Sequence, residues 1–181
     1  MGQLTRVFEF DAAHRVMNER IKCYNLHGHR FKVELTFKYE DIPALGYAID
    51  FKEVKRICGE YLDSRFDHAV ILNPQDKDLI CFVQENKWRL YIMGLGNSML
   101  DCNPSAENLA HEIRVAVAEM FTMEKHGVEL LNVRLYETPN CWVDCHRMCD
   151  PTPYTPTEEW SADFKSWREE MGDIDYDIRE I

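Results

Sequence analysis

The sequence contains few chain-breaking residues and few positive charges for its length. Only 8 Gly and 7 Pro occur among 181 residues, and 45% of the residues are hydrophobic. The chain can therefore bury one sizeable core and is too short for several. Lys and Arg number 21 against 32 Asp and Glu, which gives a formal net charge of −11. Because contact with a phosphate backbone requires clustered positive charge, we do not expect a nucleic-acid partner.

Long hydrophobic runs and targeting signals are also lacking. No apolar run approaches the roughly 20 residues that span a bilayer. Residues 1–6 show neither the apolar core of a secretory signal nor a myristoylation pattern. We therefore expect a cytoplasmic protein with no membrane partner, in which the 7 Cys are reduced thiols rather than a disulfide framework.

Hydrophobic periodicity predicts one α+β domain over residues 1–150. The segment 31–39 alternates apolar and polar residues without a break, which is typical of a strand with one buried face. Counting backwards by twos from Phe31 places His29 and His27 on the same face as the apolar residues. In all, we predict strands at 7–14, 31–39, 131–137 and 141–145, and helices at 51–63 and 106–123.

Two stretches depart from this pattern. Residues 73–103 resemble an insertion that carries a short helix and a short strand. Residues 151–181 begin with a Pro-containing linker, in which the periodicity stops, and continue as an acidic tail. We therefore place the end of the folded domain near residue 150.

Three histidines form the strongest candidate site. His27 and His29 are alternate residues of a predicted strand, so both side chains project to one side. His14, at the end of the preceding strand, can complete a site of three nitrogen ligands that leaves one coordination position open, as catalytic zinc requires. Cys23 lies nearby in the sequence, and a thiolate beside a cation is stabilised enough to act as a base or nucleophile. The alternative is that these are ordinary strand histidines and a structural thiol.

Two carboxylate motifs are further candidates. Asp67 precedes His68, and a carboxylate next to an imidazole can orient it so that it relays a proton. Glu137 closes a predicted strand, and the two oxygens of a carboxylate match a ring that presents an amino group beside a ring N–H, such as a guanine or a pterin. Taken one at a time, both motifs are more typical of solvated residues at the ends of secondary-structure elements.

Six short blocks contain these candidates. They lie at residues 10–14, 23–29, 49–51, 66–68, 103–109 and 136–138. Taken together and in this order, they resemble the 6-pyruvoyl-tetrahydropterin synthase family, specifically its 6-carboxytetrahydropterin synthase branch. The resemblance covers about residues 4–145.

The resemblance implies a tunnelling fold and an oligomer. In this α+β fold, an antiparallel four-stranded sheet carries two helices on one face, and the sheets of several subunits close into an oligomeric barrel. Family members are commonly homohexamers with active sites at subunit boundaries, so residues from two chains are expected to meet there. By the same resemblance, His14, His27 and His29 bind Zn²⁺, and Cys23 is the general base.

The remaining candidates acquire roles from the resemblance too. Asp67 and His68 complete the proton relay, and Glu137 anchors the pterin ring. Three further residues fall in the blocks that contribute to the pterin pocket: Ser105, Glu107 and Thr138.

The reaction that the resemblance implies is an internal redox cleavage of a pterin triphosphate. The substrate is 7,8-dihydroneopterin triphosphate, and the products are 6-carboxytetrahydropterin, acetaldehyde and triphosphate, on the route to queuosine-type 7-deazaguanines. No nicotinamide or flavin is needed, and the sequence carries no fingerprint for either. Two alternatives stay open: 6-pyruvoyl-tetrahydropterin synthase, which uses the same substrate and metal, and a catalytically silent zinc-binding scaffold of the same fold.

Overall fold

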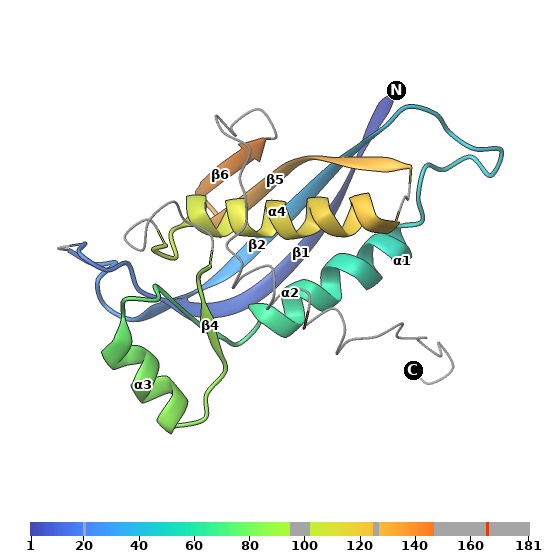
Figure 1. Cartoon of the computed structure of the whole chain (residues 1–181). Coiled ribbons are helices and arrows are strands. Elements are labelled where there is room, and N and C mark those ends of the chain that lie inside the picture. The colour runs from blue at the N-terminus through green and yellow to red at the C-terminus, as the bar shows by residue number, and fades with distance from the viewer. Residues whose placement is uncertain (20, 95–101, 125–126, 147–165, 167–181) are drawn as a thin grey trace.

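A six-stranded sheet forms the body of the molecule, and two long helical segments lie across one of its faces (Figure 1). The computed structural model describes residues 1–19, 21–94, 102–124, 127–146 and 166. The expected linker and acidic tail at 151–181 therefore lie outside the described residues, apart from residue 166.

Four antiparallel strands make up most of the sheet. They are β1 (Gly2–His14), β2 (His27–Tyr39), β5 (Val128–Thr138) and β6 (Cys141–His146), each hydrogen-bonded to the next in this order. These are the four strands that the alternation of apolar and polar residues predicts. The α+β antiparallel arrangement expected from the sequence is thus confirmed.

Two short strands extend the sheet beyond those four, and the sequence analysis anticipates only one of them. β3 (Val70–Leu72) pairs in parallel with β1, and β4 (Leu90–Ile92) pairs in parallel with β3, so the strand order is β4-β3-β1-β2-β5-β6. β4 is the strand expected within the insertion-like stretch 73–103. β3 is not evident from the sequence, because its three residues are all buried and therefore show no alternation.

The two helical segments that cover the sheet agree with the predicted helices. α1 (Phe51–Val54), the π-helical turn η1 (Lys55–Gly59) and α2 (Glu60–Arg65) follow one another without a break. α4 (Ala106–Glu124) is the second segment, and both lie on the same side of the sheet in Figure 1. A shorter helix, α3 (Lys77–Glu85), belongs to the insertion-like stretch.

The core lies between these helices and the sheet. Alternate side chains of β2 point toward α4, as a strand with one buried face requires. Burial of each large apolar side chain contributes about 1.5–3 kcal/mol to stability. The fully buried core residues of β2 and α4 include Phe31, Val33, Leu35, Phe37, Ile113, Val117 and Met120. We call this side of the sheet the helix-covered face.

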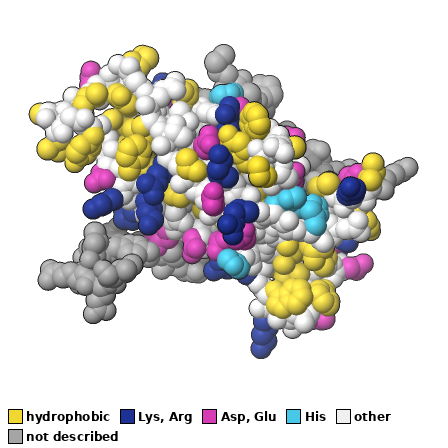
Figure 2. All heavy atoms as spheres, turned by 180° about the vertical axis from the view of Figure 1, so that it is seen from behind, with side chains coloured by type: hydrophobic (Ala, Val, Ile, Leu, Met, Phe, Trp, Pro, Cys, Tyr) yellow, Lys and Arg dark blue, Asp and Glu magenta, His cyan; other side chains and the backbone are white. Residues whose placement is uncertain are grey.

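The other side of the sheet, which we call the polar face, carries charged side chains in pairs. Arg30 of β2 binds Asp11 of β1 through two hydrogen bonds, and Arg134 of β5 binds Asp144 of β6 in the same way. Figure 2 shows positive and negative side chains next to one another over this face. No helix in the described parts of the chain is long and apolar enough to cross a membrane.

Candidate active site

Three imidazole rings meet where β1 ends and β2 begins. His14 lies directly opposite His27 in the antiparallel register, and His29 faces Ala12. One ligand nitrogen from each ring lies within 4.8 Å of those of the other two. The strand alternation that predicts a shared face for His27 and His29 therefore holds in the structure, and strand pairing brings His14 to them.

Two of the three rings are oriented by backbone carbonyls. His14 Nδ1 lies 2.6 Å from the carbonyl oxygen of Pro104, and His27 Nδ1 lies 2.7 Å from that of Asn25. A carbonyl oxygen can only accept, so each Nδ1 must carry the proton and donate. In a neutral ring, Nε2 is then left with its lone pair, which is the arrangement found in most metal-binding histidines.

Burial favours the neutral form of the His14 ring. His14 is fully buried, and within the described parts of the chain its Nε2 has no hydrogen-bond partner. Burial lowers the pKa of His14 below its usual value of 6.5, and it also lowers the pKa of the less buried His29. A buried nitrogen with a lone pair and no partner is unfavourable unless it binds something, so the three rings fit a metal ion in chemistry as well as in geometry.

A carboxylate completes the cluster. Glu137 lies near the end of β5, and its Oε1 is 3.4 Å from His14 Nε2 and 4.0 Å from His29 Nε2. Its side chain is 28% exposed, so one side of the carboxylate is open to solvent or a ligand. The sequence-predicted residues His14, His27, His29 and Glu137 are therefore brought together in one chain.

The loop that carries Cys23 is tied to the end of β1. The backbone N–H of Val16 donates to the carbonyl oxygen of Cys23 at 2.8 Å. The Arg15 guanidinium lies 5.1 Å above the ring of Tyr24, and the same guanidinium forms two hydrogen bonds to the buried carboxylate of Asp76. The thiol is partly exposed, as a residue that reacts with a substrate must be.

The expected relay pair forms, but near the polar face. Asp67 Oδ1 accepts a hydrogen bond from the backbone N–H of Asp11 at 3.0 Å, and Asp67 Oδ2 lies 2.6 Å from His68 Nδ1. His68 has a positive φ of 57°, a conformation rare for a residue with a Cβ, and its N–H donates to the Asp11 carbonyl. The carboxylate thus orients the imidazole as the sequence predicts.

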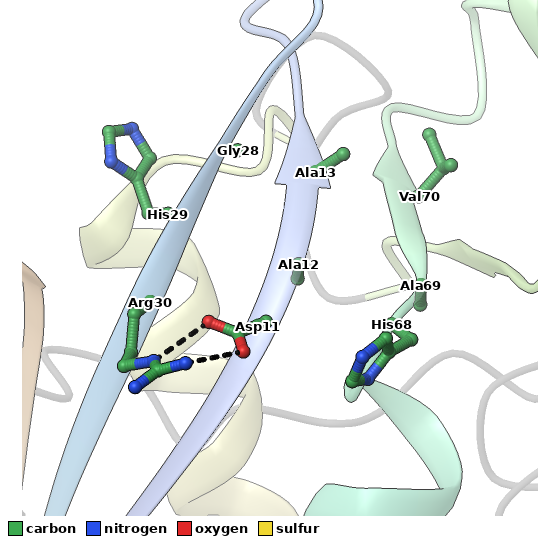
Figure 3. A pocket seen from close by; sticks show the side chains of 9 residues that line it. All are labelled: Asp11, Ala12, Ala13, Gly28, His29, Arg30, His68, Ala69 and Val70. Atoms are coloured by element: carbon green, nitrogen blue, oxygen red, sulfur yellow. Dashed lines mark hydrogen bonds and ion pairs between the residues drawn. The ribbon is translucent and has the colours of Figure 1, made fainter.

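The surroundings of this pair differ from those of the three histidines. His68 lines a hollow that Asp11, Arg30 and His29 also line, and in Figure 3 the ring of His29 extends away from the ring of His68. The His68 side chain is 76% exposed. Within the described ranges, no hydrogen bond or ion pair joins Asp67 or His68 to Cys23.

The other predicted pocket residues lie at element ends. Ser105 precedes α4, and its Oγ accepts a hydrogen bond from the N–H of Asn108 at 3.4 Å, so its hydroxyl caps the helix. Glu107 is exposed in the first turn of the same helix. Thr138 ends β5 and lies opposite Cys141.

Two groups that orient the histidines are missing from the sequence-based prediction. They are the backbone carbonyls of Pro104 and Asn25. A carbonyl leaves no signature in a sequence, because every residue has one. Asn103, which directly precedes Pro104, is the side chain that could have marked this segment, since it lies in one of the six blocks of the resemblance.

Comparison with known proteins identifies the family of this chain. A family model described as 6-pyruvoyl tetrahydropterin synthase matches residues 3–148. The chain belongs to the 6-pyruvoyl tetrahydropterin synthase family. A member from Rickettsia bellii named 6-carboxy-5,6,7,8-tetrahydropterin synthase is 34% identical over 145 residues, which cover 80% of this chain and 99% of the relative. One of the same name from Haemophilus influenzae is 26% identical over 152 residues, covering 80% and 98%.

Solved structures of the family share the fold. The 6-pyruvoyl tetrahydropterin synthase of Caenorhabditis elegans has a TM-score of 0.56 at 22% identity, covering 80% of this chain and 94% of that one. The enzyme of the same name from Plasmodium vivax has a TM-score of 0.58 at 18% identity, covering 81% and 99%. The tunnelling fold expected from the six sequence blocks is therefore confirmed.

Proposed function

We propose that this chain is a zinc-dependent lyase, 6-carboxy-5,6,7,8-tetrahydropterin synthase. It converts 7,8-dihydroneopterin triphosphate and water to 6-carboxytetrahydropterin, acetaldehyde and triphosphate, on the route to 7-deazaguanines such as queuosine. The observation that carries the proposal is the convergence of three imidazoles and the Glu137 carboxylate at the mouth of the β1–β2 pair. The name shared by relatives from Rickettsia and Haemophilus favours this activity within the family.

The three histidines are the proposed Zn²⁺ ligands. When bound, zinc supplies Lewis acidity toward the side-chain oxygens of the substrate and so makes the neighbouring C–H bonds more acidic. Two of the ligand rings, His14 and His27, are already held by carbonyls with the free nitrogen available. Little reorganisation is then needed before a metal ion binds.

Cys23 and Glu137 have distinct proposed roles beside the metal. The Cys23 thiolate removes a carbon-bound proton from the substrate side chain, for which its partial exposure leaves it accessible. The Glu137 carboxylate accepts hydrogen bonds from the amino group and ring N–H of the pterin, and this fixes the ring relative to the histidines.

The relay pair is proposed to act across a subunit boundary. Asp67 holds His68 in a fixed orientation, but His68 is 76% exposed and lies by the polar face. An exposed, oriented imidazole is available to the Cys23 of a neighbouring chain. The sheet also ends in two strands, β4 and β6, whose outer edges have no strand partner among the residues that the structure describes, and oligomerisation would cover such edges. A homohexamer with shared active sites satisfies both features.

The triphosphate requires a positive group despite the acidic composition. Arg15 is already bound to the carboxylate of Asp76, and Arg30 is bound to that of Asp11. Lys22 is exposed next to Cys23 and is the cation we propose to contact the phosphates. A local positive group can outweigh net charge at short range.

Product analysis by mass spectrometry tests this function. The zinc-loaded wild-type chain is incubated with 7,8-dihydroneopterin triphosphate beside Cys23→Ala, with Cys81→Ala as the matched control, because Cys81 is an exposed cysteine on α3. We expect 6-carboxytetrahydropterin and acetaldehyde from the wild type and the control, and a rate about 100-fold or more lower from Cys23→Ala.

Other outcomes identify the alternatives. A pyruvoyl product that depends on Cys23 would assign the 6-pyruvoyl-tetrahydropterin synthase reaction instead, in line with the name of the family model. No Cys23-dependent product from this substrate would contradict a catalytic role and favour a silent zinc-binding scaffold. Equal rates for all three proteins would remove Cys23 from the mechanism.

A further inference from the structure

The carbonyl that orients His14 belongs to a short segment just before α4. Pro104 lies in this segment, and its carbonyl oxygen accepts the hydrogen bond from His14 Nδ1 at 2.6 Å. A carbonyl can fix a ring only if its own backbone is fixed. Pro104 has no N–H with which to anchor itself, so its neighbours must hold the segment in place.

The side chain of Asn103 joins this segment to the chain that leaves β1. Its Oδ1 accepts from the backbone N–H of Met17 at 2.9 Å, and its Nδ2 donates to the Met17 carbonyl at 3.1 Å. The amide therefore pairs with both backbone groups of one residue. Met17 follows His14 closely in the sequence, so this pair ties the segment that carries the ring to the segment that carries its carbonyl partner.

Asn103 is also bound from two other directions. The buried Asn73, next to β3, donates from Nδ2 to Asn103 Oδ1 at 3.1 Å. The carbonyl oxygen of Asn103 accepts from Asn108 Nδ2 at 2.9 Å and from the N–H of Ser105 at 2.8 Å, which attaches the same residue to the first turn of α4. A single residue thus connects β1, β3 and α4 beside the ring of His14.

We propose that Asn103 is a positioning residue for the metal centre, which acts by holding the Pro104 carbonyl so that His14 Nε2 faces His27 and His29. The inference rests on the proposed zinc site. His27 is oriented independently, by the carbonyl of Asn25, so loss of Asn103 disturbs one ligand of three. Removal of an outer partner of a ligating histidine weakens metal binding by about 10- to 100-fold, and we expect an effect in this range.

The test compares zinc affinity in three variants without relying on turnover. Asn103→Ala removes all three side-chain hydrogen bonds. Asn73→Ala removes one of these three bonds, together with the hydrogen bond that Asn73 Oδ1 accepts from the N–H of Gln75 at 2.8 Å. Asn86→Ala is the control, because Asn86 uses its amide to cap the end of α3 by binding the Phe82 carbonyl at 2.8 Å. The zinc dissociation constant is measured by competition with a chelating dye, and the absorption spectrum of the Co²⁺-substituted protein reports the ligand geometry.

We expect Asn103→Ala to weaken zinc binding about 10- to 100-fold and to change the Co²⁺ spectrum, Asn73→Ala to do so less, and Asn86→Ala to match the wild type. An Asn103→Ala protein that binds zinc within twofold of the wild type with the same Co²⁺ spectrum would overturn the inference while leaving the proposed function intact. If Asn103→Ala does not fold, unchanged affinity and an unchanged spectrum in Asn73→Ala would overturn it. If the wild type binds no zinc, or if His14→Ala binds zinc as tightly as the wild type, the proposed metal centre itself would be overturned.

Discussion

The two faces of the sheet satisfy their polar groups in opposite ways. On the polar face, each of Arg30 and Arg134 is neutralised by a carboxylate through two hydrogen bonds. On the helix-covered face, the buried Nε2 of His14 has no hydrogen-bond partner among the described residues, although the Glu137 carboxylate lies 3.4 Å from it. The sheet and its register are common to both faces, so the difference lies in how the side chains are satisfied.

This contrast indicates which face carries the chemistry. Paired charges at a protein surface contribute little to stability and leave no group free to react. A buried nitrogen without a partner is unfavourable by itself and persists where binding compensates it. The hydrogen bonds and the burial of each histidine are therefore more informative than the number of histidines. His68 is exposed and its ring is held by Asp67, whereas His14 is buried and its Nε2 makes no hydrogen bond.

The largest effect is expected from a substitution in the histidine cluster on the helix-covered face. His14→Ala removes the central proposed ligand, and we expect zinc affinity to fall by more than about 100-fold and turnover to become undetectable. Arg134→Ala, on the polar face of the same sheet, should change zinc affinity by less than threefold. Competition with a chelating dye measures both constants, and similar losses in the two variants would show that the faces do not differ as described.

Glu137→Gln tests whether Glu137 binds the pterin ring or the metal ion. The amide keeps the shape of the side chain but cannot accept hydrogen bonds at both of its positions. We expect the KM for the pterin triphosphate to rise on the order of 10- to 100-fold, with zinc affinity changed by less than tenfold. Steady-state kinetics and metal titration on the same preparation check this, and the reverse pattern would make Glu137 a metal ligand.

A third comparison contrasts two Arg–Asp pairs of the same type in different surroundings. Asp76 is 2% exposed and binds Arg15, whereas Asp11 is 47% exposed and binds Arg30. Asp76→Ala leaves a partly buried guanidinium without its partner and should lower the free energy of unfolding by about 2 kcal/mol. Asp11→Ala should have a much smaller effect, because water replaces the lost contact. Urea unfolding measures the free energy of unfolding of both variants. Equal losses in the two variants would contradict the argument from burial.

The smallest expected effect concerns the pH dependence of the polar face. The Arg134 guanidinium lowers the pKa of Asp144 below its usual value of 3.8. The folded chain therefore binds fewer protons than the unfolded chain in the window just below pH 3.8, so the stabilisation is fully present above that pH and is lost as the pH falls through the folded-state pKa. Unfolding curves of Asp144→Asn and the wild type should differ slightly at pH 6 and approach each other below pH 3.8. If the difference in unfolding free energy between the two proteins grew as the pH fell, the predicted direction of the pH dependence would be wrong.

Most of the fold could be predicted from local sequence patterns. The alternation in β2 and the apolar stripes of the long helices are properties of neighbouring residues, and the predicted bounds are close to those observed. The strand β3 could not be predicted, because three consecutive buried residues show no period. The four predicted antiparallel strands are accordingly present, and the predicted short strand β4 and the unpredicted β3 extend the sheet at one edge.

The candidate site divides along the same line. By itself, the sequence determined that His27 and His29 share a face, since the side-chain period of a strand is two. Only the tertiary structure decided that the partner of His14 Nδ1 is the Pro104 carbonyl, 90 residues later in the chain, and that Glu137 of β5 approaches the same rings. It also placed Asp67 and His68 beside Asp11, and in Figure 3 the ring of His29 extends away from the ring of His68. The physical reason is that local periodicity fixes where a side chain points, whereas strand pairing and helix packing fix what it meets.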